Sequence, residues 1–286
     1  LVKNAVMGVE TLHGDFKWVG VHGPANLEGE PMSPDRPVWI ASVTKLYIAS
    51  VILKLSEDGQ IDIEEPMSAY LPADLIHGIH HTSDGVDHTD KITIRNLLSH
   101  SSGLPDYLEE SPKGEESLLD QILDGNDKDF SIEEAMDLLR NHIPAHFPPQ
   151  PLGRDKKKVR YSDTNYQLLI EIIKTIKEQS LHEAFTEMIY VPLGLKSTFH
   201  PGTRSEESAV VWSGDQPLNI PKAMRSFGDL NSTVDDMNTF MKALIDGRFF
   251  DHQETWQLMQ RDFNTFGFSL DPTPTSPTWP IAYGLG

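Results

Sequence analysis

The 286-residue sequence predicts an α+β fold, and three observations support that prediction. Two short stretches typical of β-strands open the chain, and stretches with helical spacing follow them. The two kinds of element do not alternate regularly, as they would in a doubly wound sheet. The chain also has no internal repeat of the kind that marks a solenoid or a propeller.

The predicted strands cover residues 5–11 and 17–21, with His13, Gly14 and Asp15 between them as a turn. A two-stranded hairpin is only marginally stable by itself, so further strands or a layer of helices must complete it. Residues 279–286 become aromatic and Gly-rich without a terminating helix. We therefore expect the C-terminal strands of this sheet to be missing from the chain.

The first predicted helix begins near Leu46, because apolar residues recur at helical intervals from there to Leu55, and it ends before Gly59. Another helix is expected to begin near residue 165. Two more are announced by N-terminal capping boxes, in which a side-chain oxygen accepts a backbone N–H three residues ahead. The residue pairs of these boxes are Ser131 with Glu134 and Thr233 with Asp236.

These elements suggest three consecutive regions that work as one functional domain. Residues 1–58 form an α/β region with the N-terminal strands and the first helix, and residues 59–225 form a mainly helical region. Residues 226–286 return to the α/β region and leave it incomplete. The expected architecture is an antiparallel sheet flanked by helices, beside an all-helical region.

Charge and composition exclude several classes of protein. The 43 acidic and 24 basic residues give a net charge of −19, which repels nucleic acid and anionic membrane surfaces. The basic run 154–160 is either an anion-binding patch or a solvated loop. No apolar run reaches the ~18 residues of a membrane span. The chain has no cysteine, which excludes disulfides and thiol chemistry but leaves the compartment open.

The stretch ASVTK (41–45) places a hydroxyl and an amine three residues apart at the start of the first helix. At that spacing Ser42 and Lys45 share one side of a helical turn, and the free N–H groups of a first turn favour developing negative charge. A serine becomes a nucleophile once a base takes its proton. This pair is therefore either a serine-acylation site or an N-cap beside a surface lysine.

Four further stretches follow the pair in order: LLSHSSGLPDY (97–107), RYSDTNYQLL (160–169), VPLGLKSTFHP (191–201) and FGDLNSTVDDMNTFMKAL (227–244). With ASVTK they resemble the family of class C β-lactamases, DD-peptidases, penicillin-binding proteins and related esterases. The resemblance covers most of the chain from about residue 30. It implies the β-lactamase/transpeptidase-like fold and a serine hydrolase that needs no cofactor and no metal.

The resemblance also implies a role for each matching residue. Ser42 would be the acylated nucleophile, Lys45 its hydrogen-bonded partner, and Tyr161 the tyrosine of the family's Tyr-x-Asn element, which shuttles a proton. Asp163 stands where the family has asparagine, so the substrate-binding position offers no N–H donor. Residues 162–164 also fit, less well, a relic of the Ser-Asp-Asn motif of class A enzymes.

The last element of the family, a His-x-Gly or Lys-Thr-Gly on an edge strand, is not found in the sequence. In relatives it follows shortly after a phrase like the final YGLG (283–286), so the resemblance implies a strand beyond Gly286. Trp212-Ser213-Gly214 is superficially similar but comes too early. The missing strand would supply one of two oxyanion-hole N–H groups, and losing one such donor costs about 10²–10³ in rate.

Histidines outside these motifs leave other interpretations open. His77, His80, His81 and His88 lie with several aspartates in a polar loop that is either a divalent-metal site or a solvated insertion. His100 is expected to be a structural hydrogen-bonding residue.

The sequence thus predicts a serine hydrolase that acts through an acyl-enzyme on a β-lactam, a D-amino-acid peptide or a small ester. Two alternatives remain: a catalytically silent ligand-binding protein, and an esterase without β-lactamase activity. We expect a small-molecule or peptide substrate as partner, no nucleic acid and no membrane span, with the oligomeric state open. The family resemblance alone favours a periplasmic or secreted location.

Overall fold

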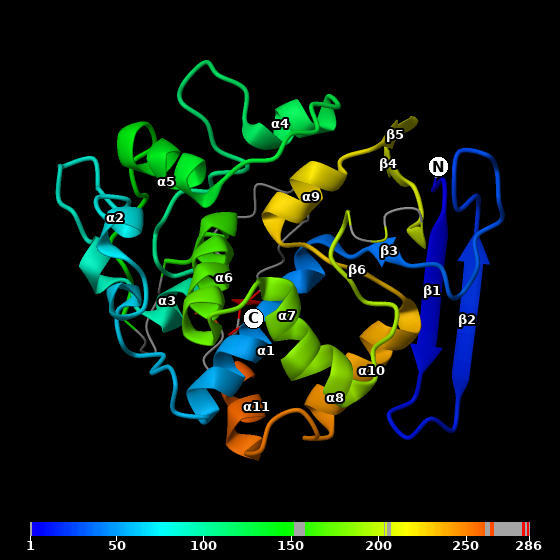
Figure 1. The fold of residues 1–286 in the computed structure, drawn as a ribbon. Helices are drawn as coiled ribbons and strands as arrows, with labels where there is room; N and C mark the ends of the chain where they lie inside the picture. The colour runs from blue at the N-terminus through cyan, green and yellow to red at the C-terminus, as the bar shows by residue number, and fades with distance from the viewer. Residues whose placement is uncertain are drawn as a thin grey trace. The chain divides into compact units, whose positions relative to one another are not determined.

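The computed structural model describes residues 2–151, 158–202, 204, 207–260, 264–265, 282–283 and 285. They form two compact units, each assembled from segments far apart in the sequence (Figure 1). The first unit comprises Leu1–Thr44, Gln121–Asp129 and Ser180–Phe249. The second comprises Lys45–Asp120, Phe130–Gln179 and Phe250–Gly286.

The first unit opens with the predicted hairpin. β1 (Ala5–Glu10) pairs antiparallel with β2 (Lys17–His22), in a register that sets Ala5 opposite His22. One face of β1 packs against α10 (Val234–Ile245), and the two elements lie side by side in Figure 1. Gly8 permits this close approach, because a Cβ at that position would overlap the side chain of Val234.

Three further strand pairs are short and antiparallel, so the predicted α+β class and antiparallel pairing are confirmed. In the first unit β3 (Val38–Trp39) pairs with β6 (Asn231–Ser232), and β4 (Val211–Ser213) pairs with β5 (Gln216–Leu218). In the second unit β7 (Asn264–Thr265) pairs with β8 (Ala282–Tyr283). Strands of two or three residues carry too little alternation to be visible in a sequence.

The helices of the first unit are mostly short. They are η1 (Ala41–Val43), α7 (Leu181–Phe185), the π-helical turn η4 (Thr186–Tyr190), α8 (Val191–Leu193), α9 (Pro221–Phe227) and α10. The predicted cap of α10 is present, because Thr233 accepts a hydrogen bond from the backbone N–H of Asp236. The short helix α4 (Leu118–Leu123) spans the point where the chain passes from the second unit to the first.

The second unit is mainly helical. Its elements are α1 (Thr44–Glu57), which enters the unit at Lys45, η2 (Met67–Ala69), α2 (Ala73–Ile76), η3 (Thr89–Lys91), α3 (Ile94–Leu98), α5 (Ile132–Asn141), α6 (Asp163–Lys177) and α11 (Gln253–Met259). The predicted capping box of Ser131 and Glu134 starts α5. None of the helices in the described part of the chain is long and apolar enough to cross a bilayer.

The core of the second unit is built on α1 and α6. Ile52 and Leu55 of α1 are fully buried, as are Leu169 and Ile173 of α6. Their spacing is the helical periodicity that predicts both helices from sequence. α6 also packs against α3, which brings its first turn to the loop that follows α3.

Candidate active site

Ser42 lies in η1, and the chain runs from this turn directly into α1. Ala41, just before it, has a φ of 45°, a left-handed conformation that costs a residue with a Cβ about 1–2 kcal/mol. Two hydrogen bonds to Leu230 hold the turn: Ile40 N–H donates to the Leu230 carbonyl (3.0 Å), and Leu230 N–H donates to Thr44 Oγ1 (3.1 Å). A strained backbone fixed by its surroundings is characteristic of functional sites.

Lys45 is the second residue of α1 and is 8% exposed. Its ammonium nitrogen lies 2.5 Å from Oδ1 of Asp163, so the two groups form a nearly buried ion pair. The same nitrogen lies 4.9 Å from the ring centroid of Tyr161 and 5.6 Å from that of Tyr166. The second unit therefore brings together three of the four predicted site residues, namely Lys45, Tyr161 and Asp163.

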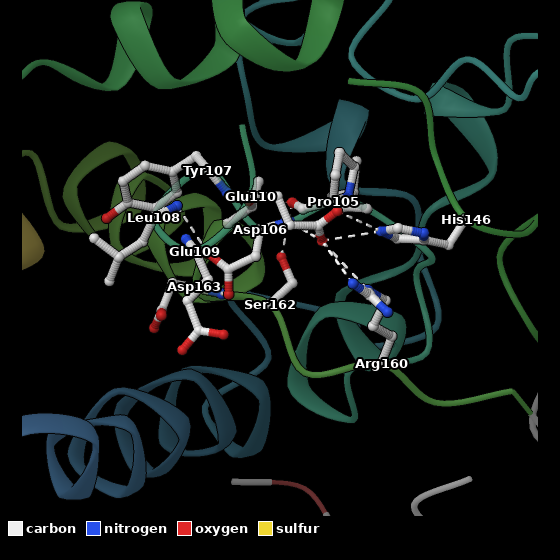
Figure 2. Close-up of polar contacts among 12 residues, drawn as sticks. Pro105, Asp106, Tyr107, Leu108, Glu109, Glu110, His146, Arg160, Ser162 and Asp163 are labelled. Atoms are coloured by element: carbon white, nitrogen blue, oxygen red, sulfur yellow. Dashed lines mark hydrogen bonds and ion pairs between the residues drawn. The ribbon is translucent and has the colours of Figure 1, made fainter. Parts of the chain in front are cut away.

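The position of Asp163 depends on how α6 begins. The N-cap residue Ser162 makes no capping bond of its own, and its hydroxyl donates instead to the Pro105 carbonyl (2.9 Å). Thr164 Oγ1 donates to the same carbonyl (2.7 Å). Asp106 completes the junction, because its Oδ2 accepts the N–H of Asp163 (3.0 Å) (Figure 2). A carboxylate from another loop thus caps α6.

Asp106 and Glu109 concentrate acidic groups beside Asp163. Asp106 is only 2% exposed, and its burial, followed by the charge of Asp163, raises its pKa to about 7. Burial and then the charge of Asp163 also raise the pKa of Glu109. Figure 2 shows Glu109 and Asp163 next to each other. Two further carboxyl groups therefore lie beside Asp163, the ion-pair partner of Lys45, where the sequence suggested one.

The imidazole ring of His100 stacks on the ring of Tyr161. Its Nδ1 accepts the N–H of Ser162 (3.2 Å) and faces the amide of Asn165 (3.1 Å), and its ring stacks on Tyr161 with centroids 4.6 Å apart. Burial, followed by the charge of Lys45, holds the pKa of His100 well below its ordinary value. The imidazole is therefore neutral, and the prediction of a structural hydrogen-bonding histidine is confirmed.

The sequence did not identify Asp106 or Glu109 as site residues, although both follow the quoted Gly-Leu-Pro stretch closely. A signal was available, since Asp106 lies within the family-like stretch 97–107 and Glu109 follows it by two residues. Only the hydrogen bond from Asp163 shows that Asp106 is turned inward.

Two candidate ion sites from the sequence can be compared with the described residues. Within the described residues, the one group of three metal-type ligands within 4.8 Å of each other is Glu57, Asp58 and Asp251, and the ammonium of Lys54 already lies 2.8 Å from Glu57 and 2.7 Å from Asp251. The histidine loop at residues 77–88 brings no such group together. Most of the basic run 154–160 and of residues 279–286 falls outside the described residues.

The structure combines mixed α+β units with a lysine close to a tyrosine ring. Comparisons with known proteins identify the family to which such a chain belongs. The Beta-lactamase family model matches residues 10–284, so the chain belongs to the Beta-lactamase family. Members of the family named as esterase, D-amino acid amidase or carboxypeptidase are serine hydrolases.

Relatives within the family have different names. Esterase EstB from Burkholderia gladioli is 29% identical over 213 residues, which is 72% of this chain and 49% of that protein. D-alanyl-D-alanine-carboxypeptidase/endopeptidase AmpH from Escherichia coli is 24% identical over 79% of this chain and 53% of its own length. The chain therefore spans about half the length of these two relatives.

A solved structure is similar over nearly the whole chain. The D-stereospecific amidohydrolase from Streptomyces sp. superimposes with a TM-score of 0.72 at 26% identity, covering 99% of this chain and 77% of that one. The predicted β-lactamase/transpeptidase-like fold is confirmed.

Proposed function

We propose that this protein is a serine hydrolase that forms an acyl-enzyme at Ser42, and that small esters are its best substrates. The observation that carries the proposal is the placement of the Lys45 ammonium, which is 2.5 Å from Asp163 and 4.9 Å from the ring of Tyr161. Similarity to an esterase over 72% of the chain supports it.

Tyr161 is the base in this proposal, because a lysine ammonium paired with a carboxylate has no free electron pair to accept a proton. The phenolate of Tyr161 takes the proton of Ser42, and Oγ of Ser42 attacks the ester carbonyl carbon. The tetrahedral intermediate then expels the alcohol, which receives the same proton from Tyr161. Water repeats the sequence on the acyl-enzyme and restores the Ser42 hydroxyl.

Lys45 supplies the positive charge that stabilises the phenolate between these steps. Asp163 fixes the ammonium in place and prevents it from moving toward the substrate. Each step uses protein groups and water, so the reaction requires no cofactor. We keep the prediction that the three sequence regions act as one functional domain.

Esters are favoured over amides and β-lactams because of Asp163. An ionised carboxylate accepts hydrogen bonds only, so it cannot donate one to the carbonyl of an amide side chain in the substrate, as an asparagine could. The negative charge of Asp163 further disfavours anionic substrates, such as penicillins, by like-charge repulsion. A small neutral ester needs no N–H donor at position 163 and is not repelled by negative charge. Its alcohol is also a better leaving group than the amine of an amide.

The nucleophile is tested with a nitrophenyl ester and with a fluorophosphonate. We expect burst hydrolysis of the ester and a single covalent adduct on the wild type, and Ser42→Ala should lower the rate at least ~10³-fold and abolish the adduct. Ser33→Ala, at an exposed serine, is the matched control and should behave as the wild type. A wild type that takes up no label would instead support the silent ligand-binding alternative.

Asp163→Asn tests the preference for esters. The change removes a negative charge beside Lys45 and restores an N–H donor, so turnover of a chromogenic cephalosporin should rise about 10-fold or more relative to the ester. The pH profile of ester hydrolysis should shift as well. An unchanged substrate ratio and an unchanged profile together would remove Asp163 from the mechanism while leaving Ser42 in it.

A further inference from the structure

A groove of about 490 Å³ lies in the first unit and does not include Ser42 among its lining residues. Its walls come from the connector before β3, from the β4–β5 hairpin and from the start of α9. Apolar side chains make up much of the lining: Leu27, Trp39, Leu218, Ile220 and Met224. A concave apolar surface of this size is typical of small-molecule sites when a few polar groups converge on it.

Three polar atoms of this lining are buried and have no hydrogen-bond partner in the part of the chain that the structure describes. They are Nε of Arg36, Oγ of Ser208 and Oδ1 of Asn231. A buried polar atom without a partner costs about 1–3 kcal/mol, and such atoms are few in native proteins. Three of them around one groove therefore call for a partner that occupies the groove.

Asn231 is the most constrained of the three. It is 3% exposed, and its backbone is paired on both sides: with Trp39 in the β3–β6 ladder, and with Phe199 through two hydrogen bonds of 2.9 and 3.0 Å. The paired backbone therefore fixes the position of the Asn231 Cβ in the lining of the groove. Its amide oxygen requires a hydrogen-bond donor, and none of the described residues supplies one.

Arg36 brings a positive charge whose Nε–H is not used by the protein. Glu30 forms an ion pair with Nη1 of Arg36 at 3.6 Å, and Glu207 also interacts with the Arg36 charge, so Nε is the donor left for a ligand. A ligand carboxylate could accept from Nε without competing for a bond that already exists. Ser208 can donate or accept, so its hydroxyl suits either group of the ligand.

We infer that this groove binds a carboxylate that carries an amide N–H next to it and an apolar side chain. The C-terminal residue of a short peptide, or an N-acyl amino acid, has all three features. The carboxylate would accept from Arg36, the amide N–H would donate to Asn231, and the apolar side chain would lie against Leu218 and Met224. The inference does not depend on acylation of Ser42.

Binding is measured by calorimetry with three probes on the full chain carrying Ser42→Ala, so that no turnover occurs. N-acetylleucine has the complete set of groups, N-acetylleucinamide lacks the carboxylate, and 4-methylpentanoate lacks the amide N–H. We expect saturable binding of N-acetylleucine, and at least ~10-fold weaker binding of each truncated probe, since a hydrogen bond to a charged or buried partner is worth about that factor.

Variants locate the site. Arg36→Met and Asn231→Ala should each weaken N-acetylleucine at least ~10-fold. The matched controls are Arg248→Met, at an arginine outside the groove, and Asn126→Ala, at an exposed asparagine outside the groove, and both should bind as the parent protein does. Circular dichroism of each variant shows whether it folds, and Ser208→Ala replaces any variant that does not, with a smaller expected loss.

The inference is overturned by absence of saturable binding at millimolar N-acetylleucine, or by equal affinity for all three probes. Equal affinity in the Arg36 and Asn231 variants would overturn it too. Because these measurements use a protein without the Ser42 hydroxyl, their failure leaves the proposed hydrolase activity untouched, and the converse also holds.

Discussion

Two regions of the molecule bury polar side chains: the loop at 105–109 together with the start of α6, and the groove beside β3. They differ in whether the buried polar atoms have hydrogen-bond partners. In the loop, Asp106 accepts three backbone N–H groups, from Asp163, Leu108 and Glu109. In the groove, Arg36 and Asn231 keep buried atoms without partners. A satisfied network holds a site in one geometry, whereas unsatisfied atoms favour the binding of something that satisfies them.

Burying a polar atom costs less free energy when the atom has a hydrogen-bond partner than when it has none. The Asp106 carboxyl group of the loop is held by hydrogen bonds within the protein, so we expect the loop to hold Lys45 and Tyr161 in place rather than to bind a ligand strongly. The groove leaves about 1–3 kcal/mol per unpaired atom to be recovered on binding. If the two regions differ in this way, substitutions in the loop should cost more stability than substitutions of the unpaired groove atoms.

The severest way to break the ordered loop is Gly103→Ala. Gly103 has a φ of +81°, and a Cβ there would overlap the backbone carbonyl of Phe147. We expect a loss of about 4 kcal/mol or more in the free energy of unfolding, measured by urea denaturation. Gly85→Ala is the matched control, with a φ of +82° and open space around it, and should cost only about 1–2 kcal/mol.

Equal losses in the two glycine variants would show that backbone conformation alone, and not the close approach to Phe147, makes Gly103 necessary. The loop would then be less tightly packed than its hydrogen bonds suggest.

Asp106→Asn tests the loop's electrostatics through pH. The pKa of Asp106 is about 7 in the folded protein and 3.8 ordinarily, so between about pH 4 and 7 the folded state holds a proton that the unfolded state has lost. The contribution of Asp106 to stability therefore falls as pH rises through that window, by up to about 4 kcal/mol in total.

The measurement is the free energy of unfolding of wild type and Asp106→Asn between pH 4 and 8. The asparagine cannot titrate, so the wild type should lose stability relative to the variant as pH rises. Parallel curves, or a gap that changes in the opposite direction, would contradict a buried, protonated Asp106.

Two serines give the smallest and most direct contrast. Ser102 is fully buried, and its hydroxyl donates to Oδ1 of Asn165 (2.6 Å) and accepts the N–H of Leu104 (3.1 Å). Ser102→Ala should therefore cost about 1–3 kcal/mol, because both partners are left buried. Ser208→Ala removes a hydroxyl that has no partner, and should change stability by less than about 0.5 kcal/mol. Similar losses in the two variants would erase the distinction between the loop and the groove.

Local spacing was enough to predict the hairpin β1–β2, helix α1 and the caps at Ser131 and Thr233. Each of these signals involves residues within one turn or one strand pair of each other, where the backbone geometry is the same in every protein. The start of α6 was placed near residue 165 and lies at Asp163, because the cap comes from Asp106 in another loop. The strands β3 to β6 were missed, since two or three residues show no alternation.

Some features of the candidate site were likewise predictable from the sequence, and others were not. The order of the motifs predicted Ser42, Lys45, Tyr161 and Asp163, and folding brings the last three together in the second unit. The inward turn of Asp106 and the exclusion of protein partners from Asn231 were not predictable, because each depends on atoms more than 25 residues away in the chain.

The sequence alone therefore determined the local features, namely the hairpin, the first helix, the helix caps, and the serine and lysine three residues apart. Which distant groups meet was settled by folding alone: that Asp163 pairs with Lys45, that Asp106 caps α6, and that three polar atoms stay unpaired in one groove. The physical reason is range. Helical spacing and capping act within a few residues, whereas burial and charge act between any groups that packing brings within a few ångströms of each other.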